Sequence, residues 1–217
     1  MKTPVDKSGW IDISATISDG MVSWPTDEPV HIFKTEEIGV NSGVANVTAI
    51  STTAHVGTHI DAPLHFFANG KDISEIDLNI LIGRAKVFNI KDKTKISYEE
   101  IKYLGIKQGD RVLFRTRNSE IDWERKPFFE DYIYLATDAA QYLADTGVQC
   151  VGVDYISIGG KENNPEVHRI ILGKPIIIIE GLKLGNVAAS EYDMVCLPLK
   201  IKGSDGGPSR VILRKRN

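Results

Sequence analysis

The segment HVGTHIDAPLHF, residues 55–66, constrains the fold more than any other part of this sequence. It holds three of the five histidines of the chain, together with an aspartate. Gly57 and Pro63 disfavour a helix, in which positions 55 and 61 would lie on different faces at about 100° per residue. An extended chain alternates its side chains between two faces. Because they all have odd numbers, an extended chain is expected to present one face made of His55, His59, Asp61 and His65.

These side chains point to a metal site. Three imidazoles and a carboxylate on one face are costly to bury without compensation, and a divalent cation would supply it. Histidine nitrogen and carboxylate oxygen are the usual ligands of zinc in catalytic sites, and they also suit manganese and iron. We therefore predict metal binding. The alternative is a set of hydrogen-bonded histidines on an ordinary surface strand.

The residues between these side chains have roles in the same geometry. Gly57 shares their face and, having no side chain, is expected to leave room for an ion or a substrate. Pro63 is expected to bend the chain, so that His65 approaches from another direction. Thr58 and Ile60 are expected to point the other way, into supporting structure or the core.

A second cluster is expected near the end of a buried strand. The run PIIIIEGL, residues 175–182, predicts a fully buried strand that ends in Glu180. Open α/β sheets place their ligand sites at such carboxyl ends. His168 lies in the short helix predicted just before this strand. An ordinary strand-end charge and an exposed helix histidine are the alternatives for these two residues, and His31 is interpreted as structural.

The remaining periodicity predicts one α/β domain, residues 1–217, with a mixed sheet. No repeat, low-complexity segment or linker divides the chain. Strands are expected at residues 10–17, 44–51, 83–90, 110–116, 148–157 and 175–182. Helices are expected at residues 96–106, 137–147 and 165–174, the first two with capping boxes made by Ser97 and Glu100 and by Asp138 and Gln141. Residues 193–201 and 209–215 read as a closing hairpin.

Composition excludes several classes of partner. The net charge of −3 gives no electrostatic reason to bind nucleic acid or an anionic membrane. The start of the chain lacks the apolar stretch of a signal peptide, and the longest clean apolar run, Ile176–Ile179, is far shorter than the about 20 residues of a membrane span. Cys150 and Cys196 are expected to be buried free thiols. These features favour a cytoplasmic protein.

The histidine segment resembles the signature of the cyclase family, the metal-dependent hydrolases that include bacterial-type kynurenine formamidase and isatin hydrolase. Further segments similar to that family follow in order: VSWPTDEP, VGVDYISIG, VHRIILGKPIIIIEGL and KIKGSDGGPSRVIL. The resemblance therefore extends from about Trp10 to Leu213. Two departures are Thr26, where the family usually has glycine, and Val56, where many members have threonine.

The resemblance implies a swivelling β/β/α fold with the metal site at one edge of the sheet. It implies metal ligands at His55, His59 and Asp61, with Asp61 able to bridge two ions. His168 and Glu180 would complete the shell of the second ion. By the same resemblance, His65 is the acid/base, Trp24 lines the substrate pocket, and the chain forms a dimer or larger homo-oligomer in which a neighbour often completes the pocket.

These features together predict a metal-dependent amidohydrolase acting on a small N-formyl, amide or lactam substrate. Zinc is the expected metal and manganese the alternative, with two ions per chain. A metal-bound hydroxide would attack the amide carbon, and His65 would pass a proton to the leaving nitrogen. Arg210 is a candidate fork for a substrate carboxylate, with a solvated arginine as the alternative. The rival functions are an enolate-forming cyclase or dehydratase and a non-catalytic metal-dependent binder.

Overall fold

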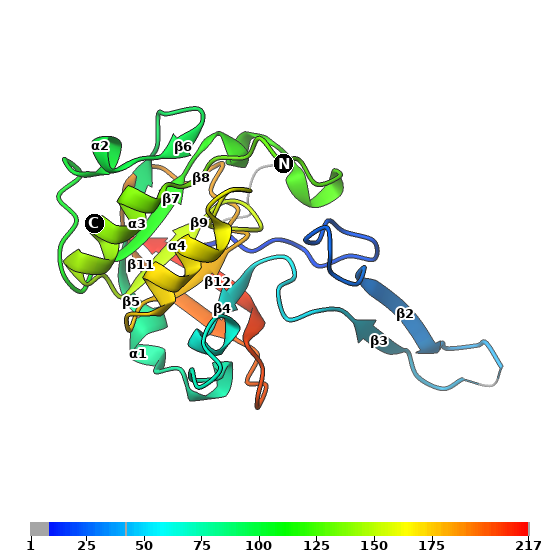
Figure 1. Cartoon of the computed structure of the whole chain (residues 1–217). Helices are drawn as coiled ribbons and strands as arrows, with labels where there is room; N and C mark the ends of the chain where they lie inside the picture. Colours follow the sequence, from blue (N-terminus) through cyan, green and yellow to red (C-terminus); the bar gives the residue numbers. More distant parts are fainter. Residues whose placement is uncertain (1–8, 42, 217) are drawn as a thin grey trace.

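A mixed β-sheet that closes on itself forms the centre of the computed structural model, which describes residues 9–41 and 43–216 (Figure 1). In sheet order its strands are β1 (Trp10–Asp12), β12 (Gly206–Lys215), β11 (Ser190–Pro198), β5 (Ile82–Asn89), β7 (Arg111–Arg115), β9 (Cys150–Val153), β10 (Ile177–Glu180) and β4 (His59–Asp61). Because β4 also pairs with β12, the strands from β12 to β4 close into a barrel-like arrangement, and β1 extends the edge of β12. The expected α/β class with a mixed sheet is confirmed.

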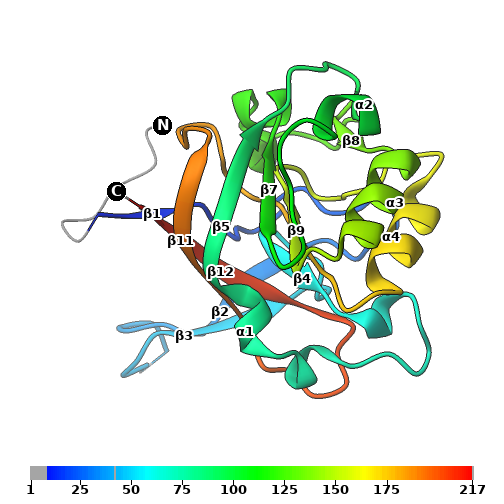
Figure 2. The same cartoon turned by 90° about the vertical axis from the view of Figure 1, so that its left-hand side faces the viewer.

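The parallel half of this sheet is built from strand–helix–strand units. β5, β7, β9 and β10 run parallel, and β4, β11 and β12 are antiparallel to their neighbours. The connections carry α2 (Tyr98–Ile101), α3 (Thr137–Thr146) and α4 (Asn164–Leu172), which lie together on one side of the sheet (Figure 2). The predicted helices at 137–147 and 165–174 are thus confirmed as α3 and α4, the latter with Pro165 in its first turn.

The four isoleucines before Glu180 divide between two hydrophobic cores. Ile176 and Ile178 belong to the core between the helices and the sheet, whereas Ile177 and Ile179 belong to the core inside the barrel. A strand buried on both faces needs apolar residues at every position, which explains the unbroken run. Cys150 and Cys196 also lie inside the barrel as buried free cysteines, as predicted.

Two of the predicted elements are shorter in the structure. The strand predicted at 10–17 pairs only as β1, followed by an isolated bridge between Ser14 and Leu182. The helix predicted at 96–106 is the single turn α2, with buried Ile96 and Ile101 on either side of its start. In both cases the regular backbone hydrogen bonding covers fewer residues than the local pattern predicted.

Both predicted capping boxes are wrong. Ser97 makes no side-chain cap, and the Glu100 carboxylate instead accepts the backbone N–H groups of Lys91 and Asp92. At α3 the N-cap position is held by Ala136, and the Gln141 amide donates to Asp145 one turn further on. In each case the polar side chain has a better-placed partner than the helix terminus.

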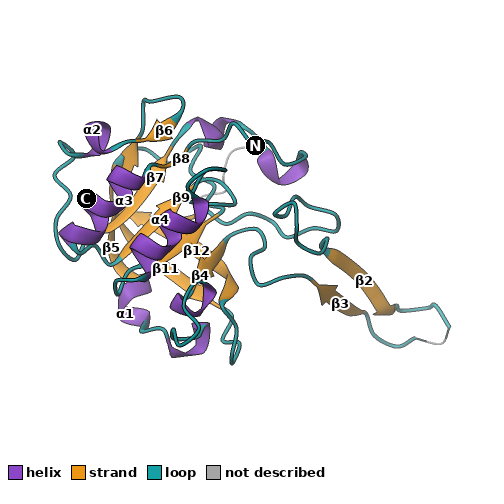
Figure 3. Ribbon diagram, in the orientation of Figure 1, coloured by secondary structure: helices purple, strands orange, loops and turns teal. Residues whose placement is uncertain are grey.

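A hairpin of β2 (His31–Glu36) and β3 (Val47–Ser51) extends away from the body of the molecule (Figure 3). Its two strands pair with each other and, among the described residues, with no other strand. β3 confirms the strand predicted at 44–51, whereas β2 was not expected. The smaller elements are the parallel pair β6 (Lys95–Ile96) and β8 (Tyr134–Leu135) and the single-turn helix α1 (Leu78–Leu81). Short 3₁₀ helices are formed by residues Pro63–His65, Ile73–Glu75, Arg117–Glu120 and Trp123–Arg125.

None of the described helices is both long enough and apolar enough to cross a membrane. The expectation that no signal peptide is present concerns residues 1–8, which lie outside the described residues.

Candidate metal centre

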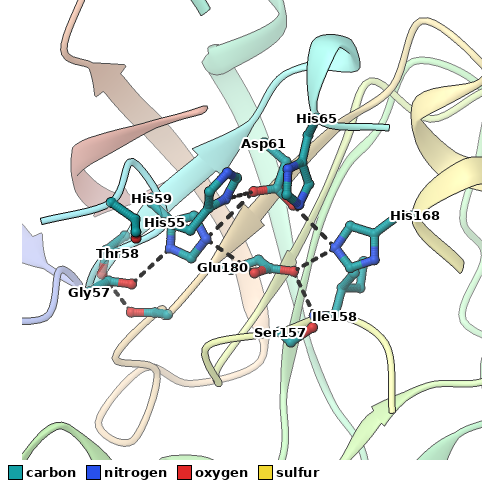
Figure 4. Close-up of polar contacts among 12 residues, drawn as sticks. His55, Gly57, Thr58, His59, Asp61, His65, Ser157, Ile158, His168 and Glu180 are labelled. Carbon is teal, nitrogen blue, oxygen red and sulfur yellow. Dashed lines mark hydrogen bonds and ion pairs between the residues drawn. The ribbon is translucent and has the colours of Figure 1, made fainter. Parts of the chain in front are cut away.

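Residues 55–65 and the later elements α4 (Asn164–Leu172) and β10 bring the site together (Figure 4). β4 carries His59 and Asp61 in the middle of the closed sheet, and its neighbour β10 places Glu180 directly opposite His59. α4 contributes His168. His55 comes from the loop before β4, and His65 from a short 3₁₀ turn, Pro63–His65, that follows it.

The backbone of the histidine segment differs from the extended chain that was predicted. Only residues 59–61 are strand, and Pro63 turns the chain as expected. Gly57 has a φ of +57° in the left-handed region, and a side chain there would meet Ile17 and Met21 rather than the site. The idea that Gly57 leaves room for an ion is therefore wrong, because glycine is needed for the turn. Thr58 and Ile60 are buried away from the site, as predicted.

Backbone carbonyls fix the tautomers of two buried histidines. Nδ1 of His59 lies 3.1 Å from the Gly57 carbonyl oxygen, and Nδ1 of His168 lies 2.7 Å from the Asn164 carbonyl oxygen. A carbonyl oxygen can only accept, so in both rings Nδ1 carries the proton that it donates. The neutral rings then present the lone pair of Nε2 to their surroundings, which is the arrangement found behind metal-binding histidines.

Those lone pairs face carboxylates. Nε2 of His59 lies 3.2 Å from Glu180 Oε2, and Nε2 of His168 lies 3.3 Å from Asp61 Oδ2. Nε2 of His59 and Oδ2 of Asp61 are both buried without a hydrogen-bond partner. Acceptors that face one another in a buried site repel unless a cation or a proton lies between them. The donor set therefore fits a divalent metal ion.

Three groups of possible ligands are found among the described residues: two of them share Asp61, and the third joins His55, His65 and Asp205. The donor atoms of His55, His59 and Asp61 lie within 4.8 Å of one another, and so do those of Asp61, His65 and His168. Glu180 is held beside both groups because its carboxylate also accepts the backbone N–H of Ile158 at 2.6 Å. One buried aspartate between two sets of imidazoles is the geometry that a bridging carboxylate requires.

The charges of the site show how it is balanced without a metal. Burial lowers the pKa of His55, but hydrogen bonds to Asp205 and Asp61 outweigh it and raise that pKa to about 11. Burial also lowers the pKa of His168, and bonds to Asp61 and Glu180 raise it to about 10. Burial raises the pKa of Asp61, but hydrogen bonds to His168 and His55 outweigh burial and hold that pKa well below its usual range. Protons on the imidazoles thus take the place of the cation.

Metal binding is therefore expected to release protons. Both raised pKa values lie above neutral pH, so His55 and His168 are protonated at pH 7 in the metal-free protein and must lose those protons to become ligands. We expect about two protons per chain to be released at pH 7, and an apparent metal affinity that rises with pH. A zinc titration in weak buffer with a pH indicator measures this, and metal uptake without proton release would contradict it.

A cavity of about 240 Å³ opens on the site. Trp24 and Phe66 form part of its apolar wall, and its other lining residues are Asp27, His55, His65, Ile156, Ser157, Asn164, His168 and Glu180. Trp24 is half-buried, and its ring lies edge-to-face with Phe128 at 5.3 Å between centroids. The structure thus brings Trp24 to the same cavity as His65 and three of the candidate metal ligands.

Arg210 is not brought to this cavity. Its Nε donates to the Asp12 carboxylate at 2.8 Å, and its side chain is 74% exposed. It lies in β12 opposite Leu197 of β11, two residues after Pro208, which pairs with His59 of β4. The interpretation as a substrate fork is therefore replaced by the alternative of an exposed arginine with a surface partner.

Asp205 is the residue of the site that sequence reasoning missed. Its Oδ2 lies 2.9 Å from Nε2 of His55 and 3.0 Å from Nδ1 of His65. These two histidines hold the pKa of its carboxyl far below the usual range. The signal that could have found it is the segment SDGGP, in which a carboxylate stands directly before two glycines and a proline.

Comparison with known proteins finds related sequences. Residues 11–159 match the family described as "Putative cyclase". A kynurenine formamidase of Geobacillus thermodenitrificans is 35% identical over 212 residues, which cover 95% of this chain and 97% of the relative. Cyclase-like protein 1 of Arabidopsis thaliana is 38% identical over 183 residues, covering 81% and 72%.

Solved structures share the fold. One described as "The Structure Of Potential Metal-Dependent Hydrolase With Cyclase Activity" has a TM-score of 0.84 and 36% identity, and covers 96% of this chain and 98% of its own. Isatin hydrolase A from Labrenzia aggregata, bound to benzyl benzoate, has a TM-score of 0.80 at 19% identity, with 95% and 94% covered. At that identity the second likeness concerns the fold alone.

Proposed function

This chain belongs to the cyclase family of metal-dependent hydrolases, and we propose that it hydrolyses the C–N bond of a small aromatic or cyclic amide. The observation that carries the proposal is the pair of buried imidazoles, His59 and His168, whose Nε2 atoms face the carboxylates of Asp61 and Glu180. The name of the kynurenine formamidase relative supports an N-formyl aryl amide as the first substrate to test.

We assign the metal ligands from the two groups that share Asp61, with Glu180 added and with His65 kept as the acid/base. His55, His59 and Asp61 would hold one ion, and His168 and Glu180, with Asp61 as the bridge, would hold the second. Zinc is the proposed metal, because its catalytic sites use this ligand set, and manganese is the alternative. When bound, such ions supply a Lewis acid that polarises a carbonyl group and lowers the pKa of water.

The protein's own residues would orient the substrate and move the proton. His65 lines the cavity and is only partly buried, so its ring can reach both water and substrate. We propose that it takes a proton from the attacking water while the oxygen–carbon bond forms. It then gives that proton to the nitrogen as the carbon–nitrogen bond breaks. The products are a carboxylic acid and an amine.

Trp24 is proposed as the wall against which the ring of the substrate packs. Replacing Trp24 by alanine should raise KM about tenfold with little change in kcat, because contacts to a remote ring bind the ground state and the transition state equally. Trp24→Phe should retain most of the affinity, since it keeps an aromatic face. Steady-state kinetics measure both variants, and an unchanged KM in Trp24→Ala would remove Trp24 from the pocket.

The first experiment measures metal content and turnover on one sample. Protein purified without chelators is analysed by mass spectrometry for zinc and manganese, and the same sample is assayed with N-formylkynurenine and a panel of lactams and other amides. About two ions per chain with amide turnover is the expected result. Proton exchange on a ketone without any hydrolysed product would instead support the cyclase or dehydratase function. No metal after reconstitution would overturn the site.

We also propose that the chain works as a homo-oligomer, in the cytoplasm. The hairpin of β2 and β3 supports the assembly, because an isolated two-stranded hairpin is only marginally stable in water. It leaves large apolar side chains in solvent at Phe33, Ile38, Val40, Val44, Val47 and Ile50. Apolar surface gathered on one extension is typical of an interface.

Charges on this hairpin should break the assembly. We expect light scattering to give a mass at least twice the 24.0 kDa of the chain, and the double variant Phe33→Glu, Ile50→Glu to move it towards the single-chain value. Tyr103→Glu is the matched control, because Tyr103 is 82% exposed and comes just after α2, which lies at the other end of the molecule from the hairpin (Figure 1). A wild-type protein that is a monomer at micromolar concentration would refute the oligomer.

A further inference from the structure

Asp205, the residue just before β12, contacts the proposed acid/base His65 although it lies far from the histidine segment in sequence. One oxygen, Oδ2, lies 3.0 Å from Nδ1 of His65 and 2.9 Å from Nε2 of His55. The rings of the two histidines lie against each other, with 4.0 Å between centroids and 32° between planes. The carboxylate therefore joins two stacked imidazoles through one atom.

The sheet places Asp205 here. β12 begins at Gly206 and pairs with β4 in the register Gly206↔Asp61, so the residue just before β12 faces the residue just after Asp61. The Asp205 carbonyl oxygen accepts the backbone N–H of Ala62 at 2.9 Å, which fixes this position. At Gly206 a side chain would meet the His55 ring at 2.9 Å, so glycine allows that ring to lie against the strand.

We propose that Asp205 is a positioning residue that selects the tautomer and orientation of His65. An ionised carboxylate can only accept, so the neutral His65 ring keeps its proton on Nδ1 and leaves Nε2 free to take one. A carboxylate plays the same part towards the histidine of the serine-protease triad. This role rests on the proposed hydrolase function, because it gives the proton transfer its direction.

The surroundings favour this role over direct contact with the substrate. The cavity is lined by His55 and His65 but not by Asp205, whose carboxylate contacts a ring nitrogen of each. The Asp205 side chain is also 43% exposed, so it does not hold a core together. Its contact with His55 leaves Nδ1 of that ring facing Asp61 at 2.9 Å, so the same carboxylate also orients a proposed metal ligand.

The test compares an amide with an ester. Both substrates use His65 to accept the proton of the attacking water, but only the amine leaving group also needs a proton from it, because 4-nitrophenolate leaves without one. Asp205→Asn should therefore lower kcat about 10- to 100-fold on N-formylkynurenine and change kcat on 4-nitrophenyl acetate by less than about fivefold, both at saturating zinc. Asp205→Ala should behave like Asp205→Asn. Equal losses on both substrates would mean that Asp205 only supports the structure, and would overturn the proposal.

A matched control is a carboxylate that holds the same loop from another segment. Asp72 holds the loop before β12 by accepting the backbone N–H of Gly203 at 2.7 Å, and it has no contact with His55 or His65 among the hydrogen bonds and ion pairs of the described residues. Asp72→Asn should leave the ratio of amide to ester turnover within about twofold of wild type. A change in that ratio as large as that of Asp205→Asn would also count against the proposal.

Two further readouts separate this inference from the proposed function. In a His65→Ala background, Asp205→Asn should cost less than about threefold, because the residue acts through His65. Nitrogen-15 NMR of histidine-labelled protein should show His65 protonated at Nδ1 in wild type and a mixture of tautomers in Asp205→Asn. A wild-type ring protonated at Nε2 would refute the role of Asp205. If wild type hydrolyses neither substrate, the proposed hydrolase function is wrong. The NMR experiment would still show whether Asp205 sets the tautomer of His65.

Discussion

Protein in which His59 is replaced by alanine should retain little metal and lose at least about 100-fold in kcat/KM. The side chain is buried in β4, its Nδ1 is committed to the Gly57 carbonyl, and its Nε2 lies 3.5 Å from Asp61 and 3.2 Å from Glu180. Without the imidazole, one ligand is missing and the two carboxylates face an empty space. Mass spectrometry of the purified variant and assays at rising zinc concentration measure both effects.

His31→Ala provides the control for that experiment. His31 is exposed at the start of β2, on the extended hairpin, and belongs to none of the groups of possible ligands found among the described residues. It should keep wild-type metal content and turnover. Full metal content together with full turnover in His59→Ala would show that the proposed metal centre is misassigned, and the histidines would then have only a structural role.

The second large effect is expected for His65. Replacing it by alanine should lower kcat about 10²- to 10⁴-fold, which is the usual contribution of a positioned acid/base. Metal content should stay near wild type, because the proposed ligands His59, Asp61, His168 and Glu180 are buried and do not depend on the His65 ring. Parallel measurements of kcat, KM and bound metal therefore separate the loss of a proton carrier from the loss of an ion.

Two outcomes would contradict this role. An unchanged kcat in His65→Ala would assign the proton transfer to another group. A parallel loss of metal and activity would make His65 a ligand, in line with the proximity of its ring nitrogen to Asp61 and His168. If a ligand bound equally well to wild type and to His65→Ala, and neither turned over any amide, the chain would be a metal-dependent binder.

The local sequence pattern correctly predicted those elements whose structure depends mainly on their own residues. The unbroken isoleucine run marked β10 because a strand buried on both faces has no polar position. Pro165 and Gly173 marked the ends of α4 because their backbone restrictions act within one turn. The capping boxes failed for the opposite reason. Glu100, for example, was free to bond to the backbone of another segment.

The spacing and chemistry of the histidine segment identified imidazole and carboxylate groups that the structure brings together at β4. The same reasoning about faces misplaced Gly57, because it assumed one extended chain where the backbone turns at that glycine. Arg210 was a candidate substrate fork because of its guanidinium group, but in the structure a surface carboxylate, Asp12, is its partner. Side-chain type indicates what a residue can bind, but the neighbours that compete for it come from the fold.

The sequence by itself determined the α/β class, the buried strands and the set of imidazoles and carboxylates suited to a metal, because these depend on periodicity and on donor chemistry. Only the tertiary structure decided the closure of the sheet and the place of Asp205. Both depend on the pairing of β12 with β4, which joins residues about 140 positions apart. That pairing depends on the packing of the whole barrel. It cannot be predicted from the sequence of any one segment.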